Sequence, residues 1–136
     1  MNPIEFVNTI YLGDRFCKCI TIDGFGDQVK IQVNMISRIR SESGNWEYYN
    51  DENIEDGIIV FDGTESIIFE PQGYVPNDEI EIVGVDQIEG NEEKFLFQIS
   101  TASCNKKGEY NEVTIKIVAK GIYLEDPANP DERITK

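Results

Sequence analysis

The side chains that most often carry acid–base and nucleophilic chemistry are scarce in this sequence. There is no histidine among the 136 residues, so Ser-His and Cys-His nucleophile pairs cannot form, and zinc and iron sites lose their usual ligand. The three cysteines, Cys17, Cys19 and Cys104, are one too few for a four-thiolate metal site. We therefore expect no catalytic residues, no metal and no cofactor, and a protein that is not an enzyme.

Carboxylates are plentiful, and two arrangements of them could carry chemistry. With 26 Asp and Glu residues, some pair will reach the spacing that a glycosidase needs by chance, so the spacing alone predicts nothing. Asp51, Asn53 and Glu55 follow the alternate positions of a calcium-binding loop. Asp56, however, stands where that loop needs glycine, and Asp62 stands where it needs glutamate. We predict no calcium site here.

The negative charge is concentrated in the middle of the chain. The net charge is −14, and between Arg40 and Lys94 there are sixteen acids and no Lys or Arg, whereas the remaining acids and bases nearly cancel. A surface with charge of one sign attracts a partner of the opposite sign and repels phosphate backbones and anionic membranes. We expect a cationic protein partner, no nucleic acid and no membrane. The alternative is a solvated surface that serves only solubility.

An aromatic cluster lies beside carboxylates within this acidic stretch. The only tryptophan and two tyrosines fall between residues 46 and 49, and aromatic rings with acids commonly anchor Arg or Lys side chains in interfaces. The alternative is that the tryptophan and one tyrosine belong to the core. The predicted partner-binding residues are Trp46, Tyr48, Tyr49, Asp51, Glu52, Glu55 and Asp56. By contrast, Arg38 and Arg40 share one face of a strand, and we predict that they pair with acids of the stretch.

The elements that would position these residues are strands. Apolar and polar residues alternate over 16–22 and over 29–35, and the acidic, glycine-containing segment between them predicts a hairpin. The apolar runs 57–61 and 65–70 are joined by Asp62-Gly63-Thr64, which predicts a second hairpin.

The pattern predicts one β domain over residues 1–136. Short strands separated by turn residues indicate an all-β protein, an antiparallel β-sandwich or open barrel of about eight strands. Helix is limited to one or two short turns, at about residues 3–8 and at 51–55. Two prolines near the C-terminus predict a loop over 126–136.

Location in the cell is predicted from what the sequence lacks. It has no basic N-terminal region followed by an apolar run, and no stretch approaches the ~20 apolar residues that span a bilayer. An odd number of cysteines makes a poor disulfide framework. We expect a cytoplasmic protein.

Several short segments carry a resemblance that spans nearly the whole chain. They are Tyr11-Leu12-Gly13-Asp14-Arg15, Ile36-Ser37-Arg38-Ile39-Arg40, Gly44-Asn45-Trp46, Val75-Pro76-Asn77-Asp78 and Ile122-Tyr123-Leu124-Glu125-Asp126-Pro127. The sequence resembles a family of small uncharacterised bacterial β-rich acidic proteins, whose members are similar to the immunity proteins of polymorphic or contact-dependent toxin systems. That resemblance implies a non-enzymatic immunity protein that neutralises a cationic, nuclease-like toxin, and it assigns no site residue. The alternatives are a ligand- or carbohydrate-binding β-domain and a structural subunit of a homo-oligomer.

Overall fold

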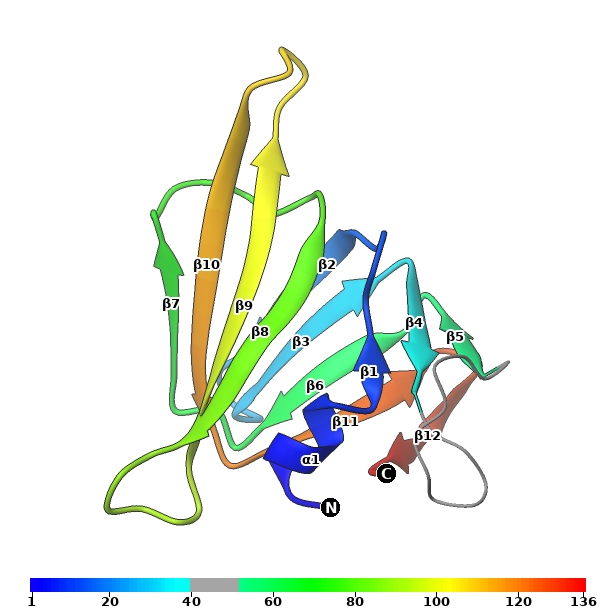
Figure 1. Cartoon of the computed structure of the whole chain (residues 1–136), viewed down its shortest axis with the longest axis vertical. Coiled ribbons are helices and arrows are strands. Elements are labelled where there is room, and N and C mark those ends of the chain that lie inside the picture. Colours follow the sequence, from blue (N-terminus) through cyan, green and yellow to red (C-terminus); the bar gives the residue numbers. More distant parts are fainter. Residues whose placement is uncertain (40–51) are drawn as a thin grey trace.

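The strands of the structure follow the alternation of the sequence. The computed structural model describes residues 1–39 and 52–136, in which one short helix and twelve strands occur (Figure 1). All the strand pairs are antiparallel, and the strands form three sheets, none of which closes into a barrel. The predicted all-β class is confirmed, with more strands than the eight or so expected because several are short.

The helix α1 (Pro3–Val7) begins at the predicted N-terminal turn. The Asn2 side chain accepts the Glu5 amide at 2.8 Å, and the Glu5 carboxylate accepts the Asn2 amide at 3.3 Å, which together form a capping box. Phe6 is buried on the inner face of the helix.

The largest sheet has five strands in the order β12-β11-β6-β3-β2. Their bounds are β2 (Cys17–Asp23), β3 (Gln28–Val33), β6 (Ile58–Asp62), β11 (Gly121–Asp126) and β12 (Asn129–Ile134). The predicted hairpin over 16–35 is confirmed as β2 and β3. The apolar strand β6 occupies the centre, with β3 and β11 on its two edges.

A second sheet has four strands in the order β7-β10-β9-β8. Their bounds are β7 (Ser66–Glu70), β8 (Ile80–Gln87), β9 (Phe95–Cys104) and β10 (Tyr110–Ala119). The β9–β10 hairpin rises above the rest of the chain in Figure 1. The register of β8 shifts between Ile82 and Gly84, which is a β-bulge.

The third sheet is small and holds the N-terminal segment. It consists of β1 (Ile10–Tyr11), β4 (Met35–Arg38) and β5 (Asn53–Glu55), in the order β1-β4-β5. The short helix expected at 51–55 is therefore wrong for the described part of that range, because β4 holds residues 53–55 in an extended ladder.

The two large sheets share one apolar core. Phe61 of β6 meets Phe97 of β9 edge to face, with ring centroids 5.1 Å apart, and both rings are fully buried. Phe6, Ile10 and Leu12 of the N-terminal segment join the same cluster. The N-terminal segment is thus fixed beside the two sheets by apolar packing.

The hairpin predicted at Asp62-Gly63-Thr64 is wrong. Gly63 does adopt a positive φ of 65°, so a tight turn forms there, but β6 and β7 belong to different sheets. The reason is that both edges of β6 are already occupied, so the chain leaves for the free edge of β10.

The loop predicted over 126–136 is also wrong, since β12 forms there. Strand β12 lies at a sheet edge and pairs only with β11. Pro130 lacks an amide proton, but an edge strand tolerates this because one side of its backbone has no partner.

No helix within residues 1–39 and 52–136 is long and apolar enough to cross a membrane.

Candidate functional site

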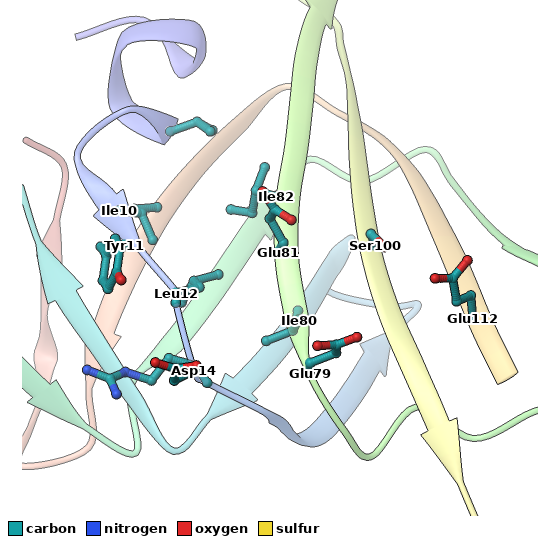
Figure 2. A pocket seen from close by; sticks show the side chains of 13 residues that line it. Ile10, Tyr11, Leu12, Asp14, Glu79, Ile80, Glu81, Ile82, Ser100 and Glu112 are labelled. Carbon is teal, nitrogen blue, oxygen red and sulfur yellow. The ribbon is translucent and has the colours of Figure 1, made fainter. Parts of the chain in front are cut away.

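A cavity of about 560 Å³ opens between the N-terminal segment and strand β8 (Figure 2). Its apolar lining combines Ile10, Leu12 and Ile80, which are buried in the core, with Val7 and Ile82, which are half-buried. In Figure 2, Ile10 and Leu12 lie on one side of the opening and Ile80 and Ile82 on the β8 side. We call this cavity the groove.

The groove exists because two sheets meet at one point and separate beyond it. Phe16 and Glu79 form an isolated antiparallel bridge. Two backbone hydrogen bonds flank it: the Cys17 amide donates to the Asp78 carbonyl at 2.9 Å, and the Ile80 amide donates to the Arg15 carbonyl at 3.3 Å. Away from this bridge, β1 pairs with β4 and β8 pairs with β9. Strands β1 and β8 do not pair with each other, because they belong to different sheets. The groove is the space where this ladder stops.

Four carboxylates line the groove on its polar side. They are Asp14, Glu79, Glu81 and Glu112, and all four are exposed. None of them forms an ion pair with a base of residues 1–39 or 52–136. Arg15 is the only base among the described residues that line the groove. Four carboxylates against one guanidinium give the lining an excess of negative charge.

Arg15 is turned toward the small sheet. Its Nη2 donates to the Ser37 hydroxyl at 3.0 Å, and that hydroxyl donates to the Asn53 side-chain oxygen at 2.7 Å. The Nε of Arg15 is buried without a hydrogen-bond partner in the part of the chain that the structure describes.

One tyrosine extends the polar rim of the groove. Tyr110, on β10, donates a hydrogen bond from its hydroxyl to the Glu79 carboxylate. This hydrogen bond, with the negative charges of Glu79, Glu112 and Asp78, raises the pKa of Tyr110 to about 12. The tyrosine therefore stays a hydrogen-bond donor to Glu79 well above neutral pH.

Several other acids of the central stretch are paired with bases. Asp56 meets Lys18 at 2.6 Å, Glu70 meets Lys116 at 3.1 Å, and Asp62 meets Arg133 at 3.8 Å. Glu65 pairs with Lys94. The surplus charge of the stretch is therefore partly neutralised, whereas the four groove carboxylates have no such partner among the described bases.

The three predicted partner-binding residues that the structure describes do not line the groove. Glu52 lies 3.8 Å from the buried Arg38, as predicted for that arginine, and Asp56 pairs with Lys18. Glu55 is exposed on β5. The other predicted residues, Trp46, Tyr48, Tyr49 and Asp51, lie outside the described residues, as does Arg40. Binding through this set stays a prediction.

Sequence reasoning missed the groove carboxylates. The alternation Glu79-Ile80-Glu81-Ile82 marks a strand, but its place at a sheet edge facing residues 10–15 depends on pairing between segments far apart in the chain. Asp14 and Glu112 lie outside the acidic stretch altogether. The one usable signal in the sequence was the alternation of isoleucines with glutamates over residues 79–82, which indicates a strand with one apolar and one acidic face.

The fold and the groove define an all-β protein with an acidic, partly apolar recess at the edge of a sheet. The chain belongs to DUF6258, a family of unknown function whose model matches residues 1–136. No curated protein and no solved structure matches it.

Proposed function

We propose that this protein is a non-enzymatic binding protein that takes up a cationic protein partner in the groove. The observation that supports this most strongly is the set of exposed carboxylates around the groove, which no described base neutralises, next to the half-buried side chains of Val7 and Ile82. Lys and Arg match such a surface, because their aliphatic stems cover apolar groups while their charged ends reach carboxylates.

A protein suits the groove better than a nucleic acid or a small cation. The net charge of −14 repels phosphate, and a volume of about 560 Å³ has room for several side chains. A hydrated metal ion would gain no binding free energy from the apolar part of the lining. Apolar side chains of a protein partner would gain it by covering that part.

Within this class, we propose an immunity protein for a cationic, nuclease-like toxin, acting in the cytoplasm of a bacterium. An acidic surface can occupy the basic groove in which a nuclease holds phosphate, and so block substrate without any chemistry of its own. The resemblance to small acidic immunity proteins supports this role.

Calorimetry against the product of the adjacent gene tests the proposal. The double reversal Glu79→Lys with Glu81→Lys should weaken binding by at least about tenfold, because each close charge pair contributes about 1.5 kcal/mol or more. The matched control, Glu89→Lys with Glu93→Lys, makes the same change in net charge on the exposed turn at the other end of β8 and should change the affinity by less than about threefold.

The outcomes separate the possible surfaces. Equal losses in the two double variants would mean that only net charge matters, and the groove would be dismissed. A loss confined to the reversal of Asp51, Glu52, Glu55 and Asp56 would move the interface to the set predicted from the sequence. Survival of cells that co-express the partner and the wild-type protein, but not the groove variant, would support the immunity role.

A further inference from the structure

The edge of β1 that faces away from β4 has free backbone groups. The Ile39 amide donates to the Thr9 carbonyl at 2.8 Å, so this carbonyl points toward the chain at the end of β4. Arg38, the partner of Ile10 in the register, instead donates its amide to the Glu52 carbonyl on its other side at 3.0 Å. Because backbone groups alternate sides along an antiparallel strand, the N–H and C=O of Ile10 face away from β4, on the groove side.

The same reasoning applies to β8. The Ile80 amide donates to the Arg15 carbonyl, on the edge opposite β9, so Ile80 and Thr101 form a non-hydrogen-bonded pair of the β8–β9 ladder. Two residues further, Ile82 occupies the equivalent position opposite Ile99. Its N–H and C=O therefore face the groove as well. No described backbone group of another element bonds to the Ile82 amide there.

The groove is thus lined by two strand edges that belong to different sheets. The ladder between residues 15–17 and 78–80 already closes one end, and beyond it the strands part with backbone groups still facing the opening. An exposed strand edge of this kind is a template for an extended chain, which adds its own donors and acceptors to the row.

Strand β8 also separates two chemically different surfaces. Ile80 and Ile82 lie with Ile10 and Leu12 on its apolar side, whereas Glu79 and Glu81 alternate with the isoleucines and are exposed. Ser100 and Glu112 lie across β8 from Ile10 and Leu12 in Figure 2. A strand added beside β8 would place every second side chain against the isoleucines and the others opposite the glutamates.

We propose that the groove binds its partner by strand addition: an extended segment in which apolar and basic residues alternate pairs with the edge of β8 beyond the Ile80–Arg15 hydrogen bond, at Ile82. This mode rests on the proposed function, since it specifies how a cationic protein would be held. The backbone bonds give affinity, the apolar residues cover the half-buried Ile82, and Lys or Arg residues face Glu79 and Glu81.

A synthetic heptapeptide, acetyl-Lys-Val-Lys-Val-Lys-Val-Lys-amide, is the probe. Titrated into the full-length protein, it should slow amide hydrogen exchange at Ile82 by at least about tenfold when bound, as measured by NMR, because this amide would gain an acceptor. The control peptide carries N-methyl groups on its three valines, which keeps charge and composition but removes backbone donors. A second control places the same residues in the order Lys-Lys-Lys-Lys-Val-Val-Val.

Binding of the alternating peptide with protection of Ile82, and at least about tenfold weaker binding of both controls, would establish strand addition. If all three peptides bind alike and Ile82 stays unprotected, or if none binds, strand addition is overturned. That result leaves the proposed function to its own calorimetric test, because the adjacent gene product could still bind through Glu79 and Glu81. If the wild-type protein binds neither the peptide nor the adjacent gene product, the groove is neither a strand-addition site nor the binding site of a cationic partner.

Discussion

The hydroxyl of Tyr110 on β10 donates a hydrogen bond to the carboxylate of Glu79, the residue directly before β8 and 31 residues away in the sequence. Both residues are exposed, and neither is adjacent to the other in the order of the four-stranded sheet, where β9 separates their strands. The bond therefore spans the outer face of the sheet and connects the turn end of the β9–β10 hairpin to the rim of the groove.

We predict that Tyr110 ionises with a pKa of about 12, against an ordinary value of 10, because its proton is held by Glu79 and its anion is repelled by nearby acids. Since the pKa is raised on folding, the hydrogen bond stabilises the protein fully below pH 10 and is lost as the pH rises through 12. Absorbance titration of the wild type against Tyr110→Phe isolates this tyrosine. Glu79→Gln should lower its midpoint, Glu93→Gln should not, and a midpoint of 10 in the wild type would contradict the assignment.

We predict that Phe97→Ala lowers the free energy of unfolding by about 3–5 kcal/mol, because it leaves a cavity where the two large sheets meet. The Phe97 side chain is fully buried and its ring packs edge to face on Phe61. Denaturant unfolding measures the change. Phe25→Ala removes the same side chain from the β2–β3 turn, where it is fully exposed, and should change the stability by no more than about 0.5 kcal/mol. Similar losses in the two variants would mean that the sheets do not share the Phe61–Phe97 core.

We predict that Arg38→Ala lowers the free energy of unfolding by about 3 kcal/mol, through lost packing and lost hydrogen bonds. Arg38 is 1% exposed, its Nη2 donates to the Thr9 hydroxyl at 2.9 Å, and its guanidinium carbon lies 5.5 Å from the centroid of the Phe6 ring. The matched control is Arg133→Ala, because Arg133 is an exposed arginine that also meets an acid and an aromatic ring. That control should cost no more than about 1 kcal/mol in thermal or denaturant unfolding. A cost for Arg38→Ala no larger than the control would show that the buried arginine does not hold the N-terminal segment.

Local pattern was enough to predict most strands but not their sheet membership. The β2–β3 hairpin follows from alternation and a glycine-containing turn, which are properties of neighbouring residues. The turn at Gly63 has the same local chemistry, yet β7 goes to β10 because β3 and β11 occupy the edges of β6. Which edges are occupied depends on pairs far apart in the sequence, and periodicity carries no record of them.

The candidate site shows the same limit. The sequence predicted a concentration of negative charge in the middle of the chain, over residues 41–93. Ion pairs with Lys18, Lys94 and Lys116 cancel part of that charge. The surviving cluster combines Glu79 and Glu81 with Asp14 and Glu112, which the charge count had placed among balanced residues. The pairing of β8, β9 and β10 brings Glu112 near Glu79 and Glu81, and the contact of β8 with the N-terminal segment adds Asp14.

The three thiols should differ sharply in reactivity, which is the last prediction. Cys17 is 2% exposed, and burial raises its pKa to about 11, so its reactive thiolate is rare near neutral pH. Cys19 lies two residues along the same edge strand but is exposed, because the register shift between Cys17 and Cys19 turns the two side chains differently. At pH 8, iodoacetamide should modify Cys19 at least about tenfold faster than Cys17 in the folded protein, as read by peptide mass spectrometry. In 6 M guanidinium the two rates should converge, since only the fold separates them. Equal rates in the native protein would mean that β2 opens readily at its first residue, next to the Phe16–Glu79 bridge that closes the groove.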